Sequence, residues 1–250
     1  AISGGQFVVD IMKEMGYEAI GLGNHEFDFG TPHLTKLVEE NGLPVVNMNL
    51  RSLHPDSLFF TPYIIKDFGG KKIAFVGVVT PESLISEAYS FFDKQGKQML
   101  SLCEDNLVDE VQKTVNEARK AGAHYVILLS HLGEASAKNF LTSHRLVSST
   151  RGIDVVLDGH THSRIPCETV LNADGDTVLL SQTGSRFKNV GKLVIRPDGR
   201  MSTELIPVDS IKQESAHVRQ VTDSIEAMMA KVTTNKICHS DYRMDLFDEN

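Results

Sequence analysis

The chain has 250 residues, 41% hydrophobic and 23% charged, which is the composition of a globular protein with a substantial core. Its formal net charge of −8 argues against a general surface for nucleic-acid polymers, although bound cations can reverse the local sign at a phosphate site. No apolar run approaches the ~20 residues of a membrane span. The three cysteines, at positions 103, 167 and 238, lack C-x-x-C spacing, so no cysteine zinc site is expected.

The first half of the chain alternates helical and strand patterns. Residues 4–15 have apolar side chains at helical spacing, and the run "EAIGL" that follows is predicted to be a short buried strand. Thr31 and Pro32 predict the start of a second helix, as its N-cap and its first helical residue. "LPVVNMNL" predicts the next strand, and residues 63–79 predict a hairpin.

The second half repeats the order strand, loop and helix. A helix is predicted over about 104–121, and the strands "HYVILL" and "DVVL" follow it, separated by a polar, helix-like stretch. From about residue 166, short strands with Gly/Asp turns predict a second sheet packed against the first, and residues 214–231 predict a last helix. This order predicts an α/β fold whose ligands lie outside the carboxyl ends of the strands.

Polar clusters follow three of the predicted strands. "GNHEFD" comes after "EAIGL", "SHLG" after "HYVILL", and "DGHTH" after "DVVL". A single histidine behind a strand is more often a hydrogen-bonded loop residue, but three clusters at equivalent strand ends indicate a shared site. If the strands are parallel neighbours, one edge of the sheet collects five side chains: Asn24, His25, His131, His160 and His162.

These side chains suit divalent metal chemistry. Imidazole nitrogens and a carboxamide oxygen are suitable ligands for transition metals such as Zn or Mn. His160 and His162, alternate residues of one turn, can point to different ions ~3.5–4 Å apart, the spacing of two-metal hydrolases. His25 beside a bound phosphate can stabilise charge or protonate a leaving group, and Asp28 can hold its imidazole in the useful tautomer.

The three motifs together resemble those of the metallophosphoesterase superfamily, and specifically its 5′-nucleotidase family with the related cyclic phosphodiesterases. The resemblance covers residues 4 to about 208. It implies an α/β fold of two mixed β-sheets packed together and flanked by helices, the four-layer sandwich of the superfamily.

The resemblance also implies roles for single residues. It implies two divalent ions, zinc, manganese or similar, in the intact parent protein. Asn24, His131 and His160 resemble the ligands of one ion, and His162 resembles a ligand of the other. His25 and Asp28 are similar to the family's catalytic dyad. The resemblance further places Asn49 near the site.

The motifs of the family are incomplete in this chain. Family members begin with strands carrying Asp-x-His and Gly-Asp, which supply further ligands and a bridging carboxylate, and neither precedes residue 24 here. Family members also continue into a C-terminal domain that holds the base. We therefore expect an N-terminally incomplete metallophosphoesterase domain at 1–212, and a linker helix with the start of an absent nucleotidase domain at 213–250.

The implied activity of the intact parent is metal-dependent hydrolysis of nucleotide phosphate esters. The alternatives are a 2′,3′-cyclic-nucleotide phosphodiesterase, a nucleotide-sugar hydrolase, or a non-catalytic fragment that keeps only the fold. We expect this chain by itself to be inactive, with partial or no metal occupancy. The expected partner is a nucleotide substrate, with no nucleic-acid polymer and no membrane span. Because family members of this branch are commonly exported, the resemblance implies a periplasmic or extracellular parent.

Overall fold

The computed structural model describes residues 3–136 and 139–234. The chain divides into two compact units. The larger unit is Tyr17–Lys212, and the smaller one joins the N-terminal segment up to Gly16 with the C-terminal segment from Gln213. Residues 235–250, which the sequence assigns to the start of a further domain, lie outside the described part of the chain.

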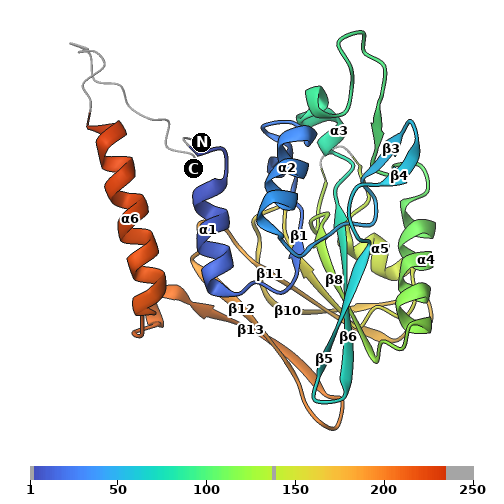
Figure 1. Cartoon of the computed structure of the whole chain (residues 1–250). Helices are drawn as coiled ribbons and strands as arrows, with labels where there is room; N and C mark the ends of the chain where they lie inside the picture. Colours follow the sequence, from blue (N-terminus) through green and yellow to red (C-terminus); the bar gives the residue numbers. More distant parts are fainter. Residues whose placement is uncertain (1–2, 137–138, 235–250) are drawn as a thin grey trace. The chain divides into compact units, whose positions relative to one another are not determined.

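The smaller unit consists of two helices that contact each other, α1 (Gln6–Met15) and α6 (Ala216–Thr233) (Figure 1). Gly16 follows the last residue of α1 in the left-handed conformation, with φ of 70°, and its backbone NH donates to a carbonyl of the last helical turn. Helix α6 begins after Ser215, whose hydroxyl accepts a hydrogen bond from the NH of Val218. Both helices are predicted by the sequence, and no described helix is long and apolar enough to cross a bilayer.

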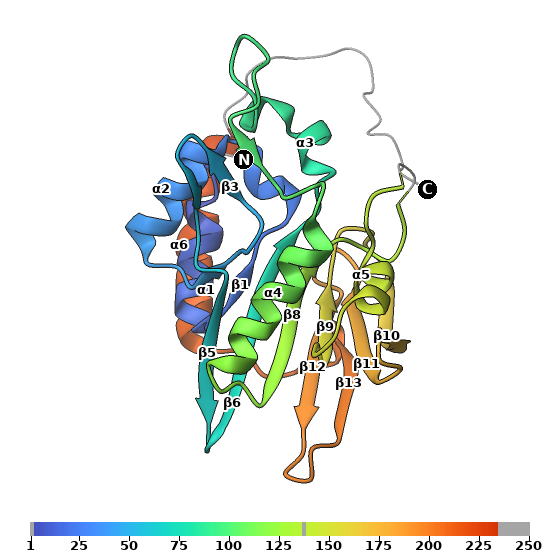
Figure 2. The same ribbon diagram turned by 90° about the vertical axis from the view of Figure 1, so that its right-hand side faces the viewer.

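A six-stranded mixed sheet forms the centre of the larger unit (Figure 2). Its strand order is β10-β11-β9-β8-β6-β5, with four parallel strands in the middle and an antiparallel strand at each edge. Because the four central strands are parallel, their carboxyl ends lie side by side. The margin of the sheet that these strand ends form is the edge at which the candidate site lies. The strands are β5 (Tyr63–Phe68), β6 (Lys71–Val79), β8 (Tyr125–His131), β9 (Val155–Asp158), β10 (Arg164–Leu171) and β11 (Thr177–Thr183).

Both faces of this sheet are covered, as the near-continuous apolar runs of its strands require. On one face, alternate residues such as Val76 pack against α4 (Leu107–Lys120) and α5 (Ser143–Ser149). On the other face, residues such as Phe75 pack with a hairpin of β12 (Asn189–Ile195) and β13 (Met201–Pro207). This alternation makes a three-layer arrangement of helices, sheet and hairpin.

A second small core surrounds the segment that follows Tyr17. Strand β1 (Ile20–Gly21) pairs in parallel with β2 (Val45–Val46), and helix α2 (Thr31–Asn41) packs beside them. Helix α2 begins one residue earlier than predicted: Thr31 is its first residue and Gly30, at φ 84°, precedes it. Glycine at that position permits the sharp entry into the helix, so no N-cap side chain is used.

Short elements complete the larger unit. They are β3 (Arg51–Leu53), β4 (Asp56–Leu58), β7 (Leu100–Ser101), α3 (Ser83–Ser86) and the 3₁₀ turns η1 (Asn24–Phe27), η2 (Ala88–Ser90) and η3 (Val208–Ser210). The α/β architecture of packed sheets flanked by helices is confirmed. Among the described residues, however, the strands outside the six-stranded sheet form separate small sheets, β1–β2, β12–β13 and β4-β3-β7.

Candidate metal and catalytic site

Three strand ends supply the predicted polar side chains. Strand β8 ends at His131, and its parallel neighbour β9 ends at Asp158, two residues before His160. Strand β1 contacts β8 and leads into η1, whose first residue is Asn24. The order of the strands therefore brings the three motifs to the same edge of the sheet, as the sequence predicts.

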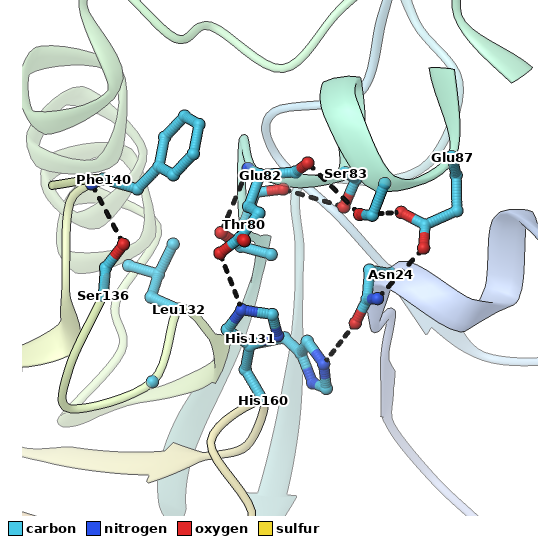
Figure 3. A network of polar contacts seen from close by, with 12 residues as sticks. Asn24, Thr80, Glu82, Ser83, Glu87, His131, Leu132, Ser136, Phe140 and His160 are labelled. Atoms are coloured by element: carbon cyan, nitrogen blue, oxygen red, sulfur yellow. Dashed lines mark hydrogen bonds and ion pairs between the residues drawn. The ribbon is translucent and has the colours of Figure 1, made fainter. Parts of the chain in front are cut away.

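The side chains of Asn24, His131 and His160 converge at this edge (Figure 3). Asn24 Oδ1 lies 3.1 Å from His131 Nε2, and the imidazole rings of His131 and His160 have their centroids 5.2 Å apart. Asn24 is 8% exposed, so its carboxamide is removed from water. The predicted meeting of these three residues is confirmed, while their role as metal ligands stays a prediction.

Gly23 and Gly159, two glycines of the motifs, have no side chain, and the ring of His131 occupies the space that a side chain would fill. A Cβ atom at Gly23 would lie 2.8 Å from His131 Cε1, and one at Gly159 would lie 2.7 Å from His131 Nδ1. Both separations are too short for non-bonded atoms, so the ring fits only between two residues without a side chain. The glycines of "GNHEFD" and "DGHTH" are therefore required by the position of a histidine from the third motif.

The environment of His131 keeps its imidazole neutral. Burial lowers the pKa of His131 to about 4, and Coulombic interactions with His160, His162 and His25 lower it in the same direction. A neutral imidazole has a free nitrogen lone pair, which is the form that binds a metal ion.

The proposed catalytic dyad lies at the exposed margin of the site. His25 Nδ1 is 3.2 Å from Asp28 Oδ1, and the two side chains are 75% and 48% exposed. The dyad is therefore open to a ligand from solvent. His25, Asp28 and the buried Glu87 also bring potential metal-ligating atoms within 4.8 Å of one another, a grouping that the sequence does not predict.

The distances at the site fit a divalent metal ion. Two atoms bound to one ion at about 2.0–2.1 Å, with bond angles near 90–109°, lie about 2.8–3.4 Å apart. The separation of Asn24 Oδ1 from His131 Nε2, 3.1 Å, falls in this range. So does the 3.2 Å between His160 Nε2 and Glu82 Oε2. The donor set of imidazole, carboxamide and carboxylate is also suited to zinc or manganese.

Comparison with curated proteins gives the chain its relatives. It is 32% identical over 170 residues to the 2′,3′-cyclic-nucleotide 2′-phosphodiesterase/3′-nucleotidase of Haemophilus influenzae, a match that covers 63% of this chain and 25% of that protein. It is 30% identical over 165 residues to the snake venom 5′-nucleotidase of Gloydius brevicauda, covering 64% of this chain and 25% of the venom protein. The chain is homologous to the 5′-nucleotidases. The resemblance inferred from the three motifs is thereby confirmed.

The fold of this chain is shared by a solved structure. The crystal structure of the calcineurin-like phosphoesterase YfkN from Bacillus subtilis superposes with a TM-score of 0.71 at 20% identity, covering 94% of this chain and 77% of that one. No family model matches the chain. The matched curated relatives are hydrolases, and the chain spans about a quarter of their length.

The carboxylate of Glu134 holds the loop that carries His160 and His162, and this arrangement is called the Glu134 clamp. His160 and His162 both adopt left-handed backbone conformations, with φ of 80° and 58°, which cost free energy in residues other than glycine. Between and beside them, the hydroxyls of Thr161 and Ser163 donate to Glu134 at 2.6 and 2.5 Å. The hydrogen bonds oppose the effect of burial and hold the pKa of Glu134 below its usual range.

Three acidic residues of the site were missed by the sequence analysis. Glu82 and Glu87 lie just before and just after the four residues of α3, and they contact His160 and Asn24, respectively (Figure 3). Glu134 directly follows "SHLG". Glu82 and Glu87 belong to no recognised motif, and only the folding of α3 over the strand ends brings them to the site. For Glu134 the available signal was its place directly after a motif.

Asn49 has a structural environment. Its carboxamide donates to the carbonyls of Val79 and Leu102 at 2.8 and 3.0 Å, and accepts from the NH of Val79 at 3.1 Å. Asn49 is fully buried. Its side chain therefore supports the carboxyl end of β6 and has its hydrogen-bonding groups occupied by the backbone.

Proposed function

We propose that the protein containing this chain hydrolyses phosphate esters of nucleotides with the help of divalent metal ions. The observation that carries the proposal is the 3.1 Å approach of Asn24 Oδ1 to His131 Nε2 in a chain homologous to nucleotidases. These two residues are 107 positions apart, and the 3.1 Å between their polar atoms, which form a hydrogen bond, is also a separation that two ligands of one metal ion can have.

In this proposal, Asn24, His131 and His160 hold one ion and His162 contributes to a second, with zinc or manganese as the metal. When bound, such ions polarise phosphoryl oxygens and offset their charge. The edge of the sheet presents the buried carboxamide of Asn24 and the neutral imidazole of His131 for this purpose, because burial keeps His131 unprotonated.

His25 and Asp28 are proposed to act on the substrate. The exposed imidazole of His25 can reach a phosphate or a leaving oxygen, and its Nδ1 faces Asp28 Oδ1 at 3.2 Å. The carboxylate accepts a hydrogen bond from Nδ1–H, which leaves Nε2 directed away from Asp28. Nε2 would then face the substrate, and when protonated it could give its proton to the leaving oxygen as a general acid, while Asp28 holds the orientation of the ring.

The named activities of the relatives leave more than one class of phosphate ester as the candidate substrate. The Haemophilus relative is named for 2′,3′-cyclic nucleotides and 3′-nucleotides, and the venom relative for 5′-nucleotides. We propose a nucleoside monophosphate as the substrate, with cyclic nucleotides and nucleotide sugars as the alternatives. The remaining alternative to an enzyme is a non-catalytic protein that keeps only the fold. A location outside the cytoplasm is proposed because one matched relative is a venom protein.

The experiment is a phosphate-release assay on the protein that contains this chain, with Mn²⁺ or Zn²⁺ and one substrate of each class. Release from a nucleoside 5′-monophosphate, its loss with a chelator and its loss in His131→Ala are the expected results. The matched control is His124→Ala, since His124 Nδ1 accepts from the backbone of Lys72 at the opposite end of β8. If none of the substrates released phosphate in a metal-dependent way, only the non-catalytic alternative would remain.

The activity of the 250-residue chain by itself is a separate prediction. We expect it to be inactive or nearly so, because Asn24, His131 and His160 are neutral ligands and His162 is the single candidate assigned to the second ion. Comparable turnover by this chain and by a version extended upstream in its reading frame would contradict that expectation.

A further inference from the structure

Glu87 is a buried carboxylate directly behind the candidate ligand Asn24 (Figure 3). It is 4% exposed and follows the last residue of α3. One carboxylate oxygen, Oε1, accepts a hydrogen bond of 3.1 Å from Asn24 Nδ2. The other, Oε2, accepts one of 2.5 Å from the hydroxyl of Ser86. Both oxygens of a charged group that is costly to bury are thus hydrogen-bonded.

The segment that carries Glu87 is anchored to the loop that carries Asn24. The hydroxyl of Ser90 donates to the carbonyl of Phe27 at 2.7 Å, and that of Tyr89 donates to the same carbonyl at 3.0 Å. The rings of Phe27 and Phe91 pack with centroids 4.9 Å apart in the core. Because these contacts fix the two segments against each other, Glu87 lies at a defined position relative to Asn24.

The chemistry of a carboxylate determines how the carboxamide is turned. An ionised carboxylate only accepts hydrogen bonds, so the NH₂ group of Asn24 must face Glu87. The carbonyl oxygen Oδ1 then faces His131, which is the observed contact. The terminal torsion of asparagine is otherwise broad and roughly two-fold, so an unsupported carboxamide can turn its NH₂ group toward the histidines. In that orientation it would offer a metal ion two hydrogens and no lone pair.

We infer that Glu87 is a positioning residue, which fixes the carboxamide of Asn24 so that Oδ1 is presented to a metal ion at His131. The inference rests on the proposed function for the identity of the ligand, and it adds a residue outside the three motifs. Groups that orient ligands in this way typically change metal affinity by about 10–100-fold when they are removed.

The first measurement needs no metal. In the metal-free chain, Asn24 Oδ1 accepts from His131 Nε2, so ¹⁵N NMR should show His131 as the Nε2–H tautomer. Glu87→Ala releases the carboxamide, and we expect a mixture of tautomers. Glu87→Gln keeps an acceptor oxygen for Asn24 Nδ2, and we expect the native tautomer. An unchanged His131 spectrum in Glu87→Ala would overturn the inference.

The second measurement is the affinity of the same proteins for Zn²⁺ by calorimetry. Glu87→Ala should weaken binding about 10–100-fold, whereas Glu87→Gln should retain most of the affinity. If Glu87 were instead a direct ligand together with His25 and Asp28, the loss of its charge in Glu87→Gln would weaken binding as much as Glu87→Ala. That result would also overturn the inference.

A matched control separates positioning from loss of stability. Glu104 is another hydrogen-bonded glutamate, which accepts from the hydroxyl of Ser101 and the NH of Leu102. Glu104→Ala should leave the His131 tautomer and the Zn²⁺ affinity unchanged. If the protein that contains this chain, in its native form, binds no Zn²⁺ while the tautomer series behaves as expected, the proposed metal site fails and the positioning of Asn24 by Glu87 stands.

Discussion

The backbone of Gly159 lies against the imidazole of His131, so closely that a Cβ atom at position 159 would come within 2.7 Å of Nδ1. The aspartate before Gly159 ends strand β9, and His131 ends the neighbouring strand β8. The contact therefore links two of the three motifs through the absence of a side chain. A glycine that looks like loop punctuation in the sequence is a packing requirement of the candidate site.

The first prediction follows from this contact. Gly159→Ala should displace the His131 ring and destabilise the chain by about 1–3 kcal/mol, the usual cost of overpacking a buried site. It should also weaken Zn²⁺ binding, because Asn24 Oδ1 and His131 Nε2 no longer meet. Urea unfolding and calorimetry measure the two effects. As a control, Gly191→Ala should cost less, since its Cβ meets only a Thr183 methyl group at 3.1 Å.

The second prediction concerns the pH dependence of stability. Burial lowers the pKa of folded His131 to about 4, aided by Coulombic interactions with three other histidines, whereas an unfolded histidine titrates near 6.5. Between these values the unfolded chain binds a proton that the folded chain does not. The free energy of unfolding therefore rises with pH through this window. The contribution of His131 is fully present above pH ~6.5 and is lost as pH falls toward ~4.

A variant makes this effect measurable. In a chelator, the chain should lose about 2 kcal/mol more unfolding free energy between pH 7.5 and 4.5 than His131→Gln does, since one pKa unit corresponds to about 1.4 kcal/mol. Urea unfolding at the two pH values gives the comparison. Equal losses in the two proteins would show that the folded state protonates His131 as readily as the unfolded state.

The sequence predicts the part of the site that lies at strand ends. Asn24, His131 and His160 follow apolar runs, and the parallel order of the strands brings them together because side chains at carboxyl ends share an edge. Hydrophobic periodicity likewise predicts the hairpin and the long helix at 107–120. These features depend on patterns within single segments.

The carboxylates near the histidines are not predictable in this way. Glu87 is 63 residues from Asn24, and Glu82 is 78 residues from His160. Their segment has no period or spacing that distinguishes it from an exposed helix. Only tertiary packing, through contacts such as that of Tyr89 with the carbonyl of Phe27, turns them toward the site. The role of a residue that acts through another residue is therefore visible only in the structure.

The third prediction concerns the Glu134 clamp. Glu134→Ala leaves the hydroxyls of Thr161 and Ser163 without their charged acceptor, and we expect a loss of about 1–3 kcal/mol in unfolding free energy. The loop that holds His160 and His162 in left-handed conformations should also relax, which weakens Zn²⁺ binding. Glu204→Ala is the control, because Glu204 forms an exposed ion pair with Lys192 that is worth little. If Glu134→Ala and Glu204→Ala changed the unfolding free energy and the Zn²⁺ affinity equally, Glu134 would have no role in holding the candidate site.

The last prediction separates the two possible roles of His25. In the protein that contains this chain, His25→Asn should lower the turnover of a nucleoside monophosphate by about 10²–10⁴-fold, the usual contribution of a general acid or base. Its metal content should stay nearly native, because the exposed His25 ring pairs with Asp28 and is assigned to the substrate. Kinetics and metal analysis on the same preparation measure both quantities.

The control and the contrary result use neighbouring groups. His33→Asn changes a histidine of α2 whose ring packs on Phe29, and it should leave turnover near the native value. The ligand-capable atoms of His25, Asp28 and Glu87 lie within 4.8 Å of one another, so a metal-binding role for His25 has a defined geometry. A His25→Asn protein that loses metal together with activity would place His25 among the ligands. Asp28→Asn would then lose metal as well, whereas under the dyad assignment it keeps its metal and loses only part of the turnover.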